Sequence, residues 1–225
     1  VRRLPRAGVL ASAAGVGTGA VSMSLRAWVS GVCVMALMLA APAAAARGQQ
    51  VLVMGDSLSA AYGLRPEQGW VALAEAKSAR YDFHNASISG ETSAGGRSRI
   101  AAELARTKPD IVVIELGAND GLRGLPLTQL GSNLGWMIGA SKAAGARVLL
   151  VGLQLPPNFG RYATDFQRSY ALIAQRLDAG LVPHFLAPLG TQRKWFQADN
   201  LHPVAAAQPL LADQMLRALD ALPAR

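Results

Sequence analysis

The feature that most constrains the fold is an alternation of short apolar runs with helical patterns over residues 47–225. Apolar, β-branched runs are typical of strands that are buried on both faces, and strands that alternate with helices form βαβ units. Right-handed crossovers then place helices on both faces of a parallel sheet. The sequence therefore predicts an α/β fold: a doubly wound, three-layer α/β/α sandwich with about five parallel strands. The expected strands are Val51–Met54, Tyr81–Ala86, Ile111–Leu116, Val148–Leu153 and Leu181–Leu186, and the expected helices are Trp70–Ala79, Ser98–Arg106, Leu127–Ala144, Phe166–Asp178 and Pro203–Leu222.

Residues 1–46 have a different composition from this domain, with four arginines and no lysine, aspartate or glutamate. Met23-Ser-Leu-Arg26 precedes the 13-residue apolar segment 27–39, and small residues follow up to Ala46. This order is typical of a secretory signal peptide, and the apolar segment is shorter than the ~20 residues of a membrane span. We expect cleavage near Ala46, an upstream extension over residues 1–22 with Met23 as the true start, and a periplasmic or secreted product of a Gram-negative bacterium. An uncleaved anchor is the alternative.

The net charge of +8 raises the question of a nucleic-acid or membrane partner. Four of the 22 basic residues and none of the 14 acidic residues fall in residues 1–46, which leaves 18 basic and 14 acidic residues and a charge of +4. The basic residues are scattered and no recognition motif occurs, so nucleic acid is not expected and membrane-surface contact should be weak at most. The only cysteine, Cys33, lies in the apolar segment, which rules out a disulfide within residues 47–225. No metal or cofactor is expected, and the protein should be a monomer.

Two loops offer a nucleophile and a base. In doubly wound sheets ligands bind beyond the carboxyl ends of the strands. Ser57 follows the first expected strand, where a helix N-terminus would favour a developing anion, although Asp56 and Ser57 could simply cap that helix. His202 precedes Pro203 and would cap the last helix. The Asp199 carboxylate can reach Nδ1 of the His202 ring, which leaves Nε2 free to accept a proton from a hydroxyl group. Alternatively, Asp199 and His202 form only an ion pair on the surface. The other histidines, His84 and His184, fall in expected strands.

Two further loops offer groups that could stabilise an anion. Gly90 follows the second expected strand, and its backbone N–H could approach a substrate closely or merely form a turn. Asn119 follows the third expected strand in Gly117-Ala-Asn-Asp120, and its amide could donate to a ligand or form an Asx turn. Taken singly, each signal has a structural explanation.

The blocks Gly-Asp-Ser, loop Gly, Gly-x-Asn-Asp and Asp-x-x-His-Pro occur in this order. With them the chain resembles the SGNH (GDSL-type) hydrolases from Gln50 to the C-terminus, and the stretches 115–124 and 155–161 are similar to the thioesterase I/lysophospholipase L1 branch. The resemblance implies a flavodoxin-like sheet and a serine hydrolase, with Ser57 as nucleophile, His202 as general base and then acid, and Asp199 as orienting carboxylate. It implies an oxyanion hole of the Ser57 and Gly90 backbone N–H groups and the Asn119 amide. Asp56 is expected to hold the loop.

The resemblance also implies the substrate class: small acyl esters, thioesters and lysophospholipids. A periplasmic location argues against acyl-CoA, which is cytosolic. In the loop 153–162, Leu155, Pro156 and Phe159 could line an acyl groove, or the loop could be an ordinary connection. Two other functions stay open: a carbohydrate O-acetylesterase of the same superfamily, and a non-catalytic periplasmic binding module.

Overall fold

The computed structural model describes residues 48–224. The signal peptide, its cleavage near Ala46, the Met23 start and Cys33 lie outside the described residues and stay predictions. Within the described part, no helix is both long and apolar enough to cross a membrane.

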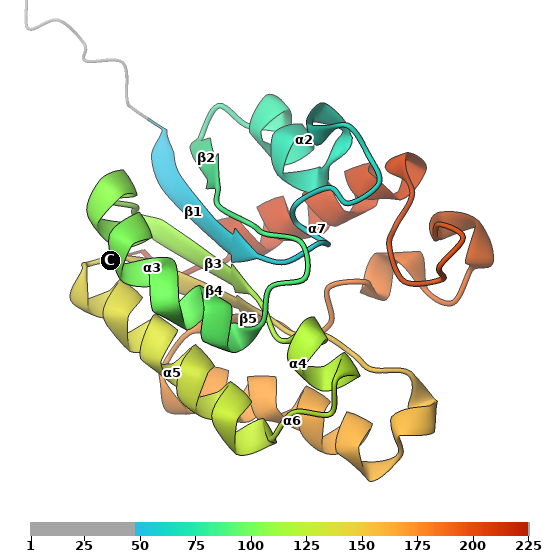
Figure 1. Ribbon diagram of the computed structural model, residues 1–225. Helices are drawn as coiled ribbons and strands as arrows, with labels where there is room; N and C mark the ends of the chain where they lie inside the picture. The colour runs from blue at the N-terminus through green and yellow to red at the C-terminus, as the bar shows by residue number, and fades with distance from the viewer. Residues whose placement is uncertain (1–47, 225) are drawn as a thin grey trace, which may run out of the picture. The chain divides into compact units, whose positions relative to one another are not determined.

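The described chain is built on one parallel sheet in which the strand order is β2-β1-β3-β4-β5 (Figure 1). The sheet order changes direction between β1 and β3, so the loops after β1, β2 and β3 meet at one edge. This confirms the predicted α/β class and the five-stranded parallel sheet. The strands are β1 (Gln49–Gly55), β2 (Tyr81–Asn85), β3 (Ile111–Glu115), β4 (Arg147–Val151) and β5 (Gly180–Val182).

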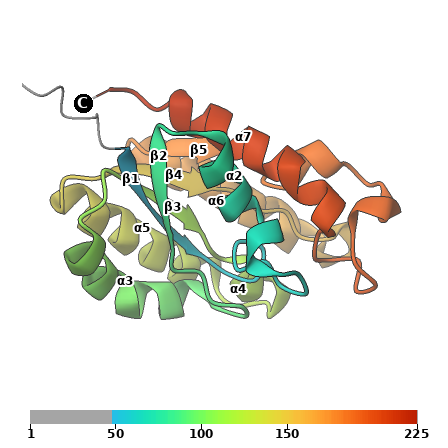
Figure 2. The same cartoon turned by 90° about the horizontal axis from the view of Figure 1, so that it is seen from above.

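Helices cover both faces of the sheet, as Figure 2 shows from above. Helices α2 and α7 pack together on one face, while α3, α5 and α6 lie on the other. The short helix α4 follows β3 at the carboxyl edge. The α-helices are α2 (Trp70–Lys77), α3 (Ser93–Thr107), α4 (Ala118–Leu122), α5 (Leu127–Ala143), α6 (Arg161–Arg176) and α7 (Gln208–Asp220), and short 3₁₀ turns are η1 (Pro66–Gln68), η2 (Pro157–Phe159), η3 (Ala187–Leu189), η4 (Arg193–Trp195) and η5 (Ala205–Ala207).

The core lies between the sheet and the two helical layers. All five residues of β3 are buried, as the central position of this strand requires. Trp70 of α2 and Tyr170 of α6 are among the largest fully buried side chains, one on each side of the sheet. In a sheet that is covered on both faces in this way, a site is expected among the loops at the carboxyl edge.

Several boundaries differ from the sequence-based expectation, among them the start of helix α6 at Arg161, five residues earlier than expected. Strand β5 ends at Val182, so His184 lies in the loop after it. Helix α3 begins five residues earlier than expected because Thr92 caps it: its hydroxyl accepts the Gly95 N–H at 3.3 Å. The last helix begins at Gln208 instead of Pro203, so the prediction that His202 caps it is wrong.

Candidate active site

Ser57, His202 and Asp199 form one continuous chain of hydrogen bonds. His202 Nε2 lies 2.8 Å from Ser57 Oγ, and His202 Nδ1 lies 2.7 Å from Asp199 Oδ2. In this order a carboxylate fixes the imidazole, and the imidazole faces the serine hydroxyl with its other nitrogen. Such an arrangement can remove the hydroxyl proton and so raise the nucleophilicity of a serine.

The loop after β1 positions Ser57 without a helix. Residues 57–63 form successive turns, so the expected helix N-terminus behind Ser57 is absent from this stretch of the described chain. The buried Asp56 carboxylate holds the turn, because its Oδ1 accepts the Leu58 N–H at 3.0 Å. The Tyr62 N–H donates to the Ser57 carbonyl at 3.1 Å and closes the next turn. Asp56 is thus placed to hold the loop, as the sequence suggested.

A tight turn positions His202 relative to its carboxylate. Asp199 Oδ1 accepts the backbone N–H groups of Leu201 and His202 at 2.9 and 3.0 Å, so its Oδ2 remains for the imidazole. Pro203, which would have started the expected helix, pairs instead with Phe196 in an isolated antiparallel bridge. This bridge draws the chain away from helical geometry, and the turn rather than a helix end carries His202.

The Asp199 carboxylate is stabilised in its charged form. Desolvation acts to raise its pKa, but the hydrogen bonds from the His202 imidazole and from the backbone N–H groups of His202 and Leu201 lower the pKa to about 2. Asp199 is therefore ionised over the neutral range. An ionised carboxylate at Nδ1 favours the tautomer that leaves Nε2 as a proton acceptor.

The loops of Ser57 and His202 are also fastened to each other. The Tyr62 ring lies against the His202 ring, with centroids 4.4 Å apart. Gln197 Nε2 donates to the Tyr62 carbonyl at 2.8 Å and to the Pro203 carbonyl at 3.1 Å. One side chain therefore links the loop that bears the serine to the loop that bears the histidine.

Two backbone N–H groups beside Ser57 are free to bind an anion. Within residues 48–224, neither the Ser57 N–H nor the Gly90 N–H donates a hydrogen bond. Gly90 has a φ of +80°, a conformation that side-chain-bearing residues rarely adopt. The glycine is therefore required by the turn and exposes its N–H at the same time.

Asn119, the third predicted donor, lies in α4 beside these groups but already has acceptors. Its Nδ2 donates to the Glu91 carbonyl at 3.0 Å and to Asp56 Oδ2 at 3.2 Å. A substrate oxyanion would have to share one of these two protons. The Glu91 side chain is held in turn by a bidentate ion pair with Arg99, which fixes the loop that carries the competing carbonyl.

An apolar cavity of about 240 Å³ opens at Ser57 and His202. Tyr62, Leu122 and Leu201 form its wall, and the full lining is Asp56, Ser57, Leu58, Tyr62, Ser89, Gly90, Ala118, Asn119, Leu122, Leu201 and His202. Sequence reasoning missed the wall residues, because they come from three separate segments: the loop after β1, helix α4 and the loop after β5. Leu122 was within reach, since it stands in the stretch 115–124 that carries the resemblance.

The predicted groove residues Leu155, Pro156 and Phe159 do not line this cavity. Leu155 is 9% exposed and packs against Gly121 on the far side of α4. Phe159 packs against the Tyr162 ring at a centroid distance of 6.4 Å, and Pro156 is exposed. The loop packs instead against α4 through Leu155 and against α6 through Phe159.

Comparison with known proteins identifies the family. Residues 53–209 match the GDSL-like Lipase/Acylhydrolase family, a span that begins within β1 and includes every predicted site residue. The chain belongs to the GDSL-like lipase/acylhydrolase family. It is a serine ester hydrolase, as the matches below also indicate.

Two relatives resemble this GDSL hydrolase in sequence over most of its length. Esterase TesA of Pseudomonas aeruginosa is 48% identical over 203 residues, which are 88% of this chain and all of the relative. Thioesterase 1/protease 1/lysophospholipase L1 of Escherichia coli K12 is 39% identical over 180 residues, which are 79% of this chain and 86% of the relative.

Solved structures agree with the fold of this GDSL hydrolase. A crystal structure of TesA superposes with a TM-score of 0.74 at 50% identity, over 76% of this chain and 98% of the other. A structure of the psychrotrophic esterase EstA from Pseudoalteromonas, inhibited by monoethylphosphonate, gives 0.73 at 41% identity, over 76% and 97%.

Two buried acids lie beneath the nucleophile of the GDSL hydrolase. Glu115, at the end of β3, is fully buried; its Oε2 accepts the Ser59 hydroxyl at 2.7 Å, and its Oε1 has no partner within the described residues. Burial raises the pKa of Asp56 to about 6, and burial together with the charge of Asp56 raises the pKa of Glu115 well above its usual value. Sequence reasoning missed Glu115 because a glutamate is rarely buried, although a charged residue inside the apolar run 111–116 was a signal that could have found it. Among the described residues, no group of three metal-ligating side chains could hold a metal ion.

Proposed function

We propose that this enzyme hydrolyses acyl esters, among them lysophospholipids, thioesters and aryl esters, through a Ser57–His202–Asp199 triad and an acyl-enzyme intermediate. The observation that carries the proposal is the unbroken hydrogen-bond chain from Asp199 through His202 to Ser57 at the mouth of an apolar cavity. A binding module without catalysis would not need this chain.

In the first half-reaction, Ser57 Oγ attacks the ester carbonyl carbon while His202 Nε2 takes the hydroxyl proton. The carbonyl oxygen becomes an anion that the Ser57 and Gly90 N–H groups bind, and the Asn119 amide joins them by turning one proton away from the Glu91 carbonyl or from Asp56. The tetrahedral intermediate then expels the alcohol or thiol, which receives the proton from His202. The acyl group remains on Ser57.

In the second half-reaction, a water molecule attacks the acyl-serine ester and gives its proton to His202 Nε2. The same N–H groups bind the new oxyanion. Collapse of this intermediate returns the proton to Ser57 Oγ and releases the carboxylic acid. Asp199 holds the imidazole in one orientation in both halves.

The cavity supports the choice of substrate. Its wall of Tyr62, Leu122 and Leu201 suits an acyl chain, whereas a sugar would need more polar partners. The relatives named above carry esterase, thioesterase and lysophospholipase in their names, in keeping with this range. We also propose that residues 1–46 are removed during export, because their composition is that of a signal peptide. Amino-terminal sequencing of the mature protein tests the cleavage near Ala46.

A panel of p-nitrophenyl esters from acetyl to palmitoyl, combined with fluorophosphonate labelling, tests the function. We expect Ser57→Ala to lose at least about 10³-fold in kcat and all labelling, whereas Ser89→Ala, in the same cavity, should keep both. Substantial turnover by Ser57→Ala would refute the nucleophile. A strong preference for acetyl esters would favour the carbohydrate O-acetylesterase instead.

A further inference from the structure

Several large apolar side chains are exposed to solvent around the mouth of the cavity. Six large apolar residues of the described chain are exposed, and four of them lie in the loops or in α4 beside Ser57: Tyr62, Ile88, Leu122 and Leu201. Tyr62, Leu122 and Leu201 also line the cavity, while Ile88 stands two residues before Gly90 and is 50% exposed. An acyl chain inside the cavity would not cover Ile88, so the apolar rim extends beyond the needs of a single bound substrate.

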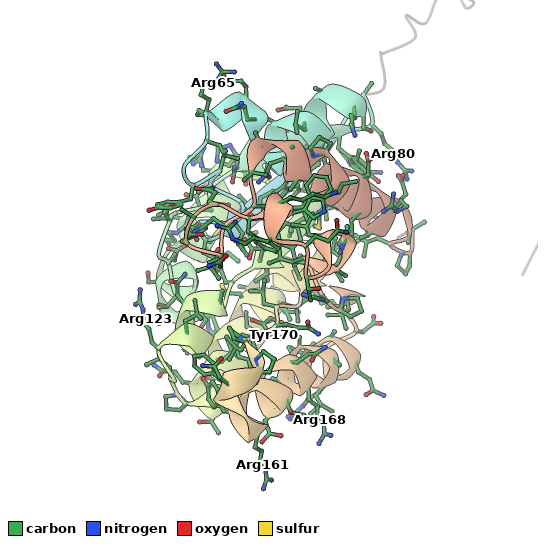
Figure 3. All side chains as sticks on the ribbon, turned by 90° about the vertical axis from the view of Figure 1, so that its right-hand side faces the viewer. Arg65, Arg80, Arg123, Arg161, Arg168 and Tyr170 are labelled. Carbon is green, nitrogen blue, oxygen red and sulfur yellow. The ribbon has the colours of Figure 1, made fainter. Side chains whose placement is uncertain are left out.

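The same loops carry an excess of positive charge. Their exposed basic residues are Arg65, Arg123, Arg161, Arg193 and Lys194, and their exposed acids are Glu67 and Asp199. Glu67 pairs with Arg65 and Asp199 with His202, while Arg161 pairs with Asp165 of α6. Within the described residues, Arg123, Arg193 and Lys194 have no acidic partner. Figure 3 shows Arg65 projecting from the top of the molecule and Arg123 from its left edge, while Arg80 projects from the right.

Apolar side chains surrounded by cations are the composition of a surface that lies in the headgroup region of an anionic lipid layer. A second copy of this chain is a poor occupant, because two such surfaces would bring their unpaired cations together. Hydrogen bonds hold the basic segments in place beside the cavity. Arg123 donates to the Gly90 carbonyl at 3.2 Å, and the Val204 N–H donates to the Trp195 carbonyl of η4 at 2.9 Å, which fastens η4 to the loop of His202.

We propose that Tyr62, Ile88, Leu122 and Leu201, together with Arg123, Arg193 and Lys194, form a docking surface for an anionic lipid–water interface. The surface would hold the cavity mouth against the lipid layer, so that an acyl ester passes to Ser57 without crossing bulk water. This inference rests on the proposed function for its substrate, but the binding itself does not require catalysis.

The test uses the Ser57→Ala protein, so that lipid is bound and not hydrolysed. Cosedimentation is measured with vesicles of phosphatidylcholine alone and of phosphatidylcholine mixed with phosphatidylglycerol. We expect stronger binding to the anionic vesicles and a loss of that binding as salt is raised. Adding Ile88→Ser, Arg193→Gln and Lys194→Gln should weaken binding by about 25-fold or more, since each basic residue near such a surface contributes roughly fivefold.

The control replaces an exposed apolar residue and an exposed arginine elsewhere, with Leu172→Ser and Arg168→Gln on α6, where Figure 3 shows Arg168. This control should bind anionic vesicles like the parent. Equal binding to both vesicle types, equal losses in the two variants, or a dimer in light scattering would overturn the docking surface. With Ser57 restored, the docking variant should hydrolyse soluble p-nitrophenyl butyrate within twofold of wild type. If wild type lacks that activity the proposed function fails, whereas activity without vesicle binding defeats only the docking surface.

Discussion

The Asn119 amide nitrogen donates to the Asp56 carboxylate oxygen Oδ2 across 3.2 Å, directly beneath the nucleophile loop. The other carboxylate oxygen accepts the Leu58 N–H. One buried acid therefore fixes both the turn that presents Ser57 and the side chain proposed as an oxyanion donor. The turn that presents Ser57 and the position of the Asn119 side chain in α4 therefore both depend on one ionisable group, and this coupling can be measured.

Replacing either Asn119 or Asp56 should weaken the stabilisation of the oxyanion. We expect Asn119→Ala to lower kcat by about 10²- to 10³-fold with little change in KM, because it removes one donor to the oxyanion. Asp56→Asn should lower kcat by the same route, since its amide would turn a donor toward the Asn119 amide. In steady-state kinetics the double variant should then lose much less than the product of the two single losses. Fully multiplicative losses would contradict the coupling.

Stability should fall as the pH rises through the weakly acidic range. The pKa of Asp56 is raised from 3.8 to about 6, chiefly by burial. The folded state therefore binds this proton more tightly, so the stabilisation is complete below about pH 4 and is lost by about pH 6, a change of about 3 kcal/mol. The raised pKa of Glu115 acts in the same direction from about pH 4.5 upward. Asp199, whose pKa is lowered to about 2, acts oppositely and only at lower pH.

Urea denaturation across this range measures the effect. Asp56→Asn should show a flatter dependence of the unfolding free energy on pH between about 4 and 6 than wild type. Glu115→Gln should also flatten the dependence from about pH 4.5 upward, because the pKa of Glu115 is raised from its ordinary value of 4.5. Parallel curves for wild type and Asp56→Asn would show that the carboxyl titrates normally in the folded protein.

Two glycines with positive φ should respond differently to alanine. At Gly90 a Cβ atom would meet no heavy atom within 4 Å, so Gly90→Ala should cost only about 1–2 kcal/mol of backbone strain. At Gly117 a Cβ would collide with the Tyr170 hydroxyl, so Gly117→Ala should destabilise the fold considerably more. Thermal denaturation compares the two. Gly90→Ala should still lose up to about 100-fold in kcat, because its N–H is displaced; a fully active variant would remove Gly90 from the oxyanion hole.

Leu122 should set the preference for acyl chain length. Leu122→Ala removes apolar wall from the cavity, so kcat/KM for an octanoyl ester should fall by roughly 5- to 30-fold, or about 1–2 kcal/mol. For the acetyl ester, kcat/KM of the variant should stay within about twofold of wild type, since the short acyl chain does not reach that wall. Leu172→Ala, on the exposed side of α6, is the matched control. Equal losses for both esters would move the acyl site elsewhere.

The sequence predicted the sheet well because a strand that is buried on both faces appears in the sequence as a continuous apolar run. The run Ile111–Glu115 is apolar up to its last residue, and the whole of β3 is buried. Helix ends were predicted less well, because tertiary contacts decide them. Pro203 is a sound signal for a first helical residue, but the bridge to Phe196 overrides it, and α7 starts at Gln208.

The sequence predicted the site residues that stand in short motifs. It did not predict the cavity residues that come together only when separate segments fold. Ser57, Asp199 and His202 stand in recognisable blocks, and the structure brings them within hydrogen-bond distance. Tyr62 and Leu201 stand in no motif, because only the folded chain brings them into the lining of one cavity. Leu155 and Phe159 showed the right composition in the right loop, but packing turned them inward.

The serine and the histidine that share a hydrogen bond are 145 residues apart in the chain. The loop that carries the histidine is held by Gln197 to Tyr62, and it immediately precedes α7, which packs on α2. On the proposed mechanism, the protein can hydrolyse esters only after the last quarter of the polypeptide has packed onto the rest of the fold. A chain threaded through a membrane in unfolded form would therefore travel as an inert precursor, and the onset of ester cleavage would mark the moment at which its folding is complete.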